Sequence, residues 1–198
     1  MATRKRTAAI RRTTKETDIA ARLVIDGRGV CGIDTGIPFF DHMLELLTRH
    51  ALFDLTLKAR GDLLVDYHHT VEDVGLVLGD ALNQALGERR GIVRYGCAHV
   101  PMDDALSRIA IDLGGRPYLV YQVALRKQKI RDFDVRLIRE FLQAFAAQGR
   151  LNLHVAQFYG AEAHHAAESI FKALARALRA ACAIDPRERG VPSSKGRI

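Results

Sequence analysis

Aromatic residues and cysteines are scarce in this chain. It has no tryptophan and only 7% aromatic residues. Its three cysteines, Cys31, Cys97 and Cys182, lie far apart without a CxxC spacing. This spacing argues against a disulfide framework, a thiolate zinc site and an iron–sulfur cluster.

Long apolar runs are also missing. No segment approaches the roughly eighteen uninterrupted apolar residues of a membrane span, and residues 1–16 lack the apolar stretch of a signal peptide. We therefore expect a cytoplasmic protein without a membrane partner. The few aromatic residues and the scattered basic residues give little support to a surface that stacks nucleic-acid bases, so we expect no nucleic-acid partner.

The composition is that of a folded protein with an excess of positive charge. The chain has 198 residues, 48% hydrophobic and 27% charged, which is enough apolar material for one large domain or two small ones. The formal net charge of +7 is compatible with a phosphorylated small molecule as ligand. The number of histidines, eight, is the less ordinary feature of the composition. If the protein holds a metal, we therefore expect imidazole and carboxylate ligands.

Hydrophobic periodicity predicts alternating strands and helices. In the first half, strand patterns cover 8–14, 18–26 and 51–62, and helix patterns cover 39–50 and 68–86. In the second half, strand patterns cover 92–100, 107–113, 117–125 and 151–158, and helix patterns cover 133–148 and 164–182. The common order is strand, strand, helix, strand, helix.

The two halves also match residue by residue. Placing His68-His69-Thr70-Val71-Glu72 over His164-His165-Ala166-Ala167-Glu168 gives an offset of 96 residues, which also superposes Leu78 on Leu174 and Leu46 on Leu142. This match predicts a tandem duplication of an α+β unit, with helices on one side of the sheets. We expect a flexible basic tail at 1–7, repeat halves at 8–90 and 91–185, and a C-terminal tail at 186–198.

Each half begins its last helix with HHxxE, a pattern that fits metal binding. Residues four apart share a helix face, so His68 with Glu72, and His164 with Glu168, can each hold one ion. His69 and His165 point roughly 100° away and could reach a second ion. One such motif is more typical of a surface, but two copies in register favour metal binding.

Two further histidines can complete these sets. His42 lies on the first predicted helix and His154 on the strand before the second HHxxE. Six histidines and two glutamates then divide into two sites of three imidazoles and one carboxylate, which leaves open coordination positions for catalysis. This donor set suits Mn, Fe, Ni, Co or Zn.

Basic and hydroxyl side chains offer a candidate phosphate site. Each is individually more typical of an ordinary surface, and together they gain meaning if they surround the metal ions. They are Arg94, Arg116, Lys172, Ser194 and Lys195.

From about Ala8 onwards the chain resembles the imidazoleglycerol-phosphate dehydratase family. The segments that carry this resemblance are HHTVED, HHAAES, FFDHML, RYGCAHVPMDDAL, DLGGRPY, FKALARAL and the final PSSKG. The resemblance implies a hydro-lyase of histidine biosynthesis that converts imidazole glycerol phosphate into imidazole acetol phosphate. It also implies a tandem fold of the ribosomal protein S5 domain 2-like type and a cage of twenty-four subunits with active sites between them.

The resemblance assigns roles to individual residues. It implies two manganese ions per subunit on His42, His68, His69, Glu72, His154, His164, His165 and Glu168. The family pattern R-x-T-x-E-T matches Arg12, Thr14, Glu16 and Thr17, which makes Glu16 the expected acid/base and a substrate ligand. The implied phosphate pocket consists of Arg94, Arg116, Lys172, Ser194 and Lys195.

The chain departs from the family pattern in three places, and two other functions remain open. It reads GAEAHH for GKNDHH, PSSKG for PSTKG, and Ser169 for an alanine. A metal-dependent phosphoesterase would also use two metal ions with histidine ligands, but it typically bridges them with Asp or Glu. A basic RNA-binding module is the other alternative, by analogy of fold alone.

Overall fold

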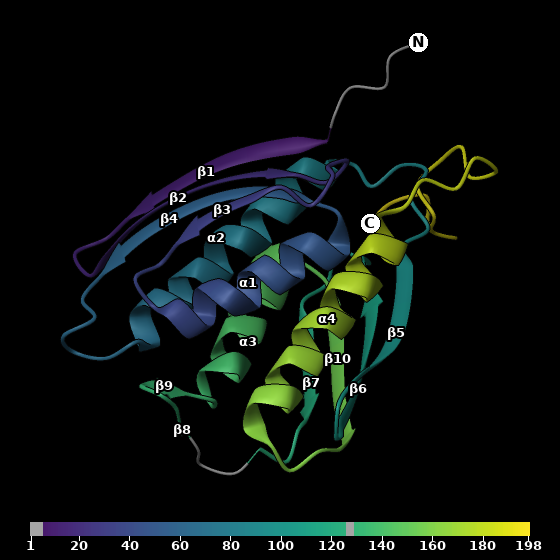
Figure 1. Cartoon of the computed structure of the whole chain (residues 1–198). Helices are drawn as coiled ribbons and strands as arrows, with labels where there is room; N and C mark the ends of the chain where they lie inside the picture. The colour runs from purple at the N-terminus through teal and green to yellow at the C-terminus, as the bar shows by residue number, and fades with distance from the viewer. Residues whose placement is uncertain (1–5, 126–128) are drawn as a thin grey trace.

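In this computed structural model, the described residues form two four-stranded sheets that enclose a layer of four helices (Figure 1). The structure describes residues 6–125 and 129–198. Each sheet turns one face towards the helices. The hydrophobic core lies on these inner faces, as the sequence pattern predicts.

The first half runs from β1 to α2. Its sheet has the order β1-β2-β4-β3, with β3 parallel to β4 and the other pairs antiparallel. The elements are β1 (Thr7–Thr13), β2 (Thr17–Val24), β3 (Cys31–Asp34), α1 (Pro38–Ala51), β4 (Asp54–Gly61) and α2 (His68–Leu86).

The second half repeats this arrangement. Its sheet has the order β5-β6-β10-β7, again with one parallel pair, and a small β8-β9 hairpin is added before α3. The elements are β5 (Tyr95–Met102), β6 (Ala105–Asp112), β7 (Tyr118–Gln122), β8 (Lys129–Ile130), β9 (Phe133–Asp134), α3 (Leu137–Gly149), β10 (Asn152–Tyr159) and α4 (Ala163–Cys182).

Strand register shows that the repeat found in the sequence is also present in the structure. Thr17 of β2 pairs with Gly61 of β4, and Ser107 of β6 pairs with Gln157 of β10. Gly61 and Gln157 are 96 residues apart, which is the offset that superposes the two HHxxE motifs. Thr17 and Ser107 are therefore equivalent positions in the two halves.

The structure differs from the predicted elements in a few places. The four-stranded sheet of each half takes three strands from before the first helix of that half, and in the first half the short strand Cys31–Asp34 is one that the sequence pattern does not reveal. The predicted helix over 133–148 begins at Leu137, because Phe133 and Asp134 form β9. The first strand begins at Thr7, while residues 1–5 of the expected tail lie outside the described residues.

The helices of the two halves pack against each other at close range. Gly75 and Gly79 of α2 face the backbone of α3, where an added Cβ would lie 2.6 Å from the Phe141 carbonyl oxygen and 2.5 Å from that of Phe145. On the other side of the layer, α1 packs against α4. This second contact brings α1 next to the start of the second HHxxE helix.

A buried arginine of the first half forms hydrogen bonds with the second half. Arg89 is 3% exposed, and its guanidinium donates to the carbonyl oxygens of Leu113, Gly149 and Arg150 and to the side-chain oxygen of Asn83. Burial lowers the pKa of Arg89 from its usual value. The carbonyls at the end of α3 stabilise the cation because that end of a helix is its negative pole.

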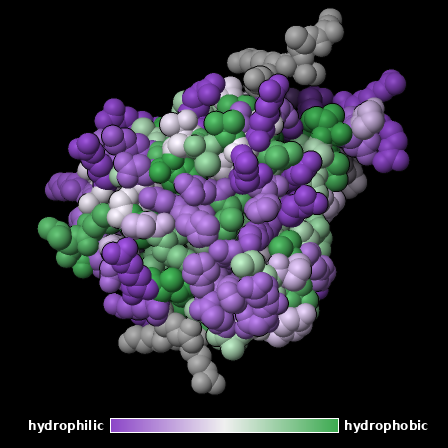
Figure 2. All heavy atoms as spheres, viewed as in Figure 1, coloured by the Kyte–Doolittle hydropathy of each residue, from purple (hydrophilic) through white to green (hydrophobic). Residues whose placement is uncertain are grey.

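One face of the molecule is mostly polar (Figure 2). Figure 2 shows that hydrophilic residues cover most of this view, with hydrophobic residues in smaller groups between them. Among the described residues, no helix is long and apolar enough to cross a membrane.

Candidate metal centre and active site

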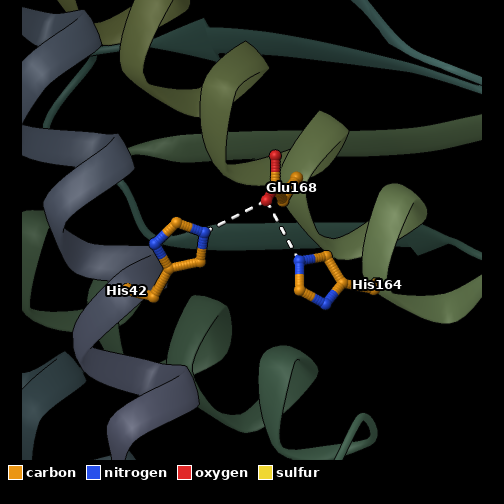
Figure 3. A group of neighbouring side chains, drawn as sticks. All are labelled: His42, His164 and Glu168. Atoms are coloured by element: carbon orange, nitrogen blue, oxygen red, sulfur yellow. Dashed lines mark hydrogen bonds and ion pairs between the residues drawn. The ribbon is translucent and has the colours of Figure 1, made fainter.

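Two helices bring three candidate ligands to one point. His42 of α1 faces His164 and Glu168 of α4, and both imidazoles point at the same carboxylate (Figure 3). His42 Nε2 lies 3.0 Å and His164 Nε2 3.1 Å from Glu168 Oε1. One ligand atom from each residue falls within 4.8 Å of the others. This group, here called the α1–α4 triad, has the spacing and chemistry to hold a metal ion.

The carboxylate of the α1–α4 triad is charged. Burial alone would raise the pKa of Glu168, but hydrogen bonds from Lys172 and His42 outweigh it and lower the pKa to about 2. Lys172 Nζ donates to Glu168 Oε2 at 2.6 Å and lies 3.1 Å from Met102 Sδ. One carboxylate oxygen therefore faces the two imidazoles, while the other is bound by a cation.

The donor set of the α1–α4 triad fits the expected type of ion. Neutral imidazoles and a carboxylate bind divalent transition metals, and a divalent ion favours the ionised carboxylate. These residues leave coordination positions free, as a catalytic ion requires.

The first HHxxE has a different environment. His68 Nε2 lies 3.7 Å from Glu72 Oε2, as the spacing of four predicts. The ring of His69 points elsewhere, with Nδ1 2.9 Å from Asp62 Oδ2 and 3.8 Å from Glu16 Oε2. Because a carboxylate accepts, Nδ1 of His69 carries the proton, and Nε2 is left as a ligand atom. The hydrogen bond with Asp62 raises the pKa of His69.

His165 has an analogous partner. Its Nδ1 lies 2.7 Å from Asp104 Oδ1, and its Nε2 lies 3.4 Å from Asp103 Oδ2. The hydrogen bond with Asp104 raises the pKa of His165. Asp103 and Asp104 form the turn between β5 and β6, just as Glu16 lies in the turn between β1 and β2. In each half, the second histidine of HHxxE thus meets a carboxylate from the first hairpin.

The other candidate ligand lies apart from these groups. His154 is exposed on β10, between the buried residues Leu153 and Val155. Since successive side chains of a strand alternate, His154 faces away from the helix layer. Within the described residues of one chain, the structure joins three of the eight predicted ligands, His42, His164 and Glu168, into a group that could hold a metal.

Sequence reasoning did not find Asp62 and Asp104. Each orients a candidate ligand but comes from a turn or loop outside the HHxxE motif, so no spacing in the sequence predicts its role. The structure also explains the GAEAHH segment. Glu162 is the N-cap of α4, and its side chain accepts from the His165 backbone N–H at 2.7 Å.

The candidate phosphate ligands divide into two places. Lys172 lies beside the α1–α4 triad, as described above. Arg94 instead pairs with Asp112, with Nε 2.7 Å from Oδ1, and donates to the Pro192 carbonyl oxygen at 2.7 Å. The hydrogen bond with Asp112 raises the pKa of Arg94. Arg116, Ser194 and Lys195 have exposed side chains.

These two places are far apart within one chain. The backbone N–H of Arg94 donates to the carbonyl of Ala181, near the end of α4. Glu168 is thirteen residues earlier on the same helix, a separation of about 20 Å at 1.5 Å per residue. A ligand that used both places in one chain would have to follow most of the length of α4.

Comparison with known proteins gives a consistent result. The family model for imidazoleglycerol-phosphate dehydratase matches residues 35–178. The chain is 58% identical over 194 residues to the imidazoleglycerol-phosphate dehydratase of Nitrobacter hamburgensis, covering 98% of each chain. It is also 58% identical to that of Methylorubrum extorquens, covering 98% of this chain and all of the relative.

Solved structures share the fold. A crystal structure of imidazoleglycerol-phosphate dehydratase from Staphylococcus aureus aligns with a TM-score of 0.82 at 36% identity, covering 90% of this chain and 99% of that one. The enzyme from Pyrococcus furiosus, in complex with (S)-C348, aligns with a TM-score of 0.83 at 36% identity, covering 96% and 100%. These matches confirm the duplicated α+β fold of the ribosomal protein S5 domain 2-like type. The chain belongs to the imidazoleglycerol-phosphate dehydratase family.

Proposed function

We propose that this chain is a hydro-lyase that removes water from imidazole glycerol phosphate to form imidazole acetol phosphate in histidine biosynthesis. The observation that carries the proposal is the α1–α4 triad beside Lys172, in a chain that matches family members over almost its whole length. Imidazole and carboxylate ligands with a neighbouring cation suit a substrate that has a metal-binding ring at one end and a phosphate at the other.

The metal site is assigned to manganese, with two ions per chain. The ligands are the two HHxxE sets with His42 and His154, namely His42, His68, His69, Glu72, His154, His164, His165 and Glu168. A bound ion would favour the anionic form of the substrate's imidazole and so help the adjacent hydroxyl to leave. Asp62 and Asp104 would hold His69 and His165 with Nε2 free for an ion.

Glu16 is assigned as the acid/base. The proton to be removed lies on a carbon with no neighbouring carbonyl, so an exposed carboxylate alone is too weak a base for it. Glu16 therefore has to act next to the ring-activating site, and its Oε2 lies 3.8 Å from His69 Nδ1. Its side chain is 55% exposed, which leaves room for a substrate to approach.

The phosphate end is assigned to Lys172, Arg94, Arg116, Ser194 and Lys195. Anchoring the phosphate would position the reacting carbons relative to Glu16. Because Arg94 and the α1–α4 triad lie about 20 Å apart along α4, one ring and a three-carbon phosphate ester cannot reach both in one chain. We therefore assign the complete sites to the junctions between subunits, and the family resemblance favours a cage of twenty-four chains.

The test combines product analysis with metal removal. Purified protein is incubated with imidazole glycerol phosphate, and both the enolisable ketone product and inorganic phosphate are measured. We expect ketone without released phosphate, loss of activity after chelation, and recovery with Mn²⁺. Elemental analysis should find about two ions per chain for two three-imidazole, one-carboxylate sets. Released phosphate would instead indicate a phosphoesterase, and full turnover by metal-free protein would contradict the metal assignment.

A further inference from the structure

A buried carboxylate outside the candidate ligand set ties the first hairpin to α2. Asp73 follows Glu72 on α2 and is 8% exposed. Its Oδ2 accepts the hydroxyl of Thr17 at 2.5 Å, and its Oδ1 accepts Nε of Arg12 at 3.1 Å. Arg12 lies on β1 and Thr17 on β2, so one carboxylate holds both strands of the hairpin against the helix.

The turn of this hairpin is closed by local hydrogen bonds. The hydroxyl of Thr14 accepts the backbone N–H groups of Glu16 and Thr17, and the Thr14 N–H donates to the Thr17 carbonyl at 2.8 Å. The Thr14 and Thr17 hydroxyls are themselves 3.2 Å apart. Glu16 thus occupies a compact turn, and Asp73 binds the residue directly after it.

The placement of Glu16 depends on this attachment. Its own carboxylate is exposed and lies 3.8 Å from His69 Nδ1, beyond hydrogen-bonding distance. A loose ion pair between exposed groups fixes a side chain weakly. The anchored backbone of the turn is therefore what keeps Glu16 beside the start of α2, where His69 lies.

The second half has an attachment at the equivalent place. Ser107, which corresponds to Thr17 by strand register, hydrogen-bonds Ser169 at 2.6 Å, and both residues are fully buried. Ser169 is 96 residues after Asp73, so the two helix positions also correspond. The hairpin-to-helix bond is common to both halves, but it is a charge-assisted bond only in the half that carries Glu16. Such bonds are shorter and stronger than neutral ones.

We propose that Asp73, through Thr17 and Arg12, is a positioning residue that sets where the Glu16 carboxylate stands in the active site. This inference rests on the proposed role of Glu16 as the acid/base. Asp73 itself touches neither substrate nor the reacting atoms. Its contribution is to attach the hairpin turn to α2, so that the backbone that carries the catalytic group has a fixed position.

The experiment compares two carboxylates with the same kinds of partner. Asp18 also accepts a threonine hydroxyl, from Thr13 at 2.8 Å, and an arginine N–H, from Arg11 at 3.0 Å, but these bonds stay within the hairpin. Asp73→Asn is the test and Asp18→Asn the matched control. Thr17→Val, which removes the hydroxyl and keeps the branched shape, is a second test that leaves the helix unchanged. Thr17→Ser restores the hydroxyl as the conservative rescue.

Each variant is measured for kcat, KM, metal content and assembly. We expect Asp73→Asn and Thr17→Val to lower kcat between about 10- and 100-fold, the scale of a misplaced catalytic group, with KM changed less than about threefold. Metal content and assembly should stay those of the unchanged protein. Asp18→Asn and Thr17→Ser should keep kcat within about threefold of it, since neither loses the bond to α2. Wild-type kcat in both Asp73→Asn and Thr17→Val would overturn the proposal.

A double-mutant comparison separates positioning from a general structural effect. If Asp73 acts through Glu16, adding Asp73→Asn to Glu16→Gln should lower kcat less than about twofold further. An equal loss in both backgrounds would overturn the proposal. Amide hydrogen exchange over 10–17 should rise in Asp73→Asn whatever the role of Glu16. If Glu16→Gln retains full kcat while this exchange rises, the acid/base assignment fails and the attachment stands; unchanged exchange contradicts the attachment itself.

Discussion

Glu168 is buried and ionised, so its contribution to the stability of the fold depends on pH and is lost at low pH. The hydrogen bonds from Lys172 and His42 hold its pKa at about 2, against an ordinary value of 4.5. A carboxyl group with a lowered pKa stabilises the fold above its ordinary pKa, and this contribution disappears as the pH falls towards the lowered value. The relevant window is therefore about pH 4.5 to 2.

We expect this effect to be visible in metal-free protein. The difference in free energy of unfolding between the unchanged chain and Glu168→Gln should be largest near pH 6 and should shrink as the pH is lowered from about 4.5. Urea unfolding of both proteins after chelation, at several pH values, measures this difference. Parallel pH profiles for the two proteins would show that Glu168 has no special ionisation in the fold.

Glu16 is the residue whose replacement should separate chemistry from binding. We expect Glu16→Gln to bind substrate with little change in KM but to lose kcat by about 10²- to 10⁴-fold, the usual contribution of a general acid/base. Steady-state kinetics with manganese-loaded protein measures both constants. A kcat close to that of the unchanged enzyme would remove Glu16 from the mechanism.

The candidate site was predictable from the sequence only in part. The pairing of His164 with Glu168 follows from a spacing of four on a helix, and the structure has it at 3.1 Å. The approach of His42 depends on the packing of α1 against α4, which no spacing encodes. The roles of Asp62 and Asp73 could not be predicted from the sequence for a similar reason, because their partners depend on how a loop and a hairpin pack onto α2.

At the scale of the elements, the close approach of α2 and α3 depends on glycine. Alanine favours a helix over glycine by about 1 kcal/mol. At position 79, however, a Cβ would meet the Phe145 carbonyl oxygen at 2.5 Å and the Gly149 nitrogen at 2.8 Å. The helices would have to separate, and the two halves with them.

We therefore expect Gly79→Ala to destabilise the chain by about 1–3 kcal/mol, because overpacking outweighs the gain in helix propensity. Gln84→Ala, at an exposed position of the same helix, is the control and should change stability by less than about 0.5 kcal/mol. Chemical denaturation of both variants gives the comparison. A more stable Gly79→Ala protein would mean that α2 and α3 do not meet as closely as described.

Element prediction succeeded where periodicity was long and failed where it was short. The helix 68–86 was predicted with its observed bounds, because nineteen residues repeat an apolar face. The strand Cys31–Asp34 has four residues, of which three are exposed, so it shows no alternation to recognise. The predicted helix 133–148 wrongly includes Phe133, because this residue is apolar like the buried face of the helix. In the structure Phe133 belongs to β9 and packs against Phe39 and Phe40.

At the scale of the whole molecule, the separation of the candidate ligands makes assembly part of the proposed activity. If metal ions join ligands from different chains, their removal should shift the assembly towards smaller species. Size-exclusion chromatography with light scattering, before and after chelation and again with Mn²⁺, tests this expectation. An unchanged profile in chelated, demonstrably metal-free protein would place the ions within single chains.

The helix layer has an internal two-fold correspondence between the halves of the chain. The contact of α2 with α3 and the contact of α4 with α1 are equivalent, because α3 corresponds to α1 and α4 to α2 in the repeat. A surface with this property is self-complementary, like that of a two-fold dimer. A single half therefore has a surface complementary to that of a second copy of itself, and the chain has the form of a two-fold homodimer joined into one polypeptide. The two halves differ at the equivalent positions 73 and 169, where aspartate and serine stand.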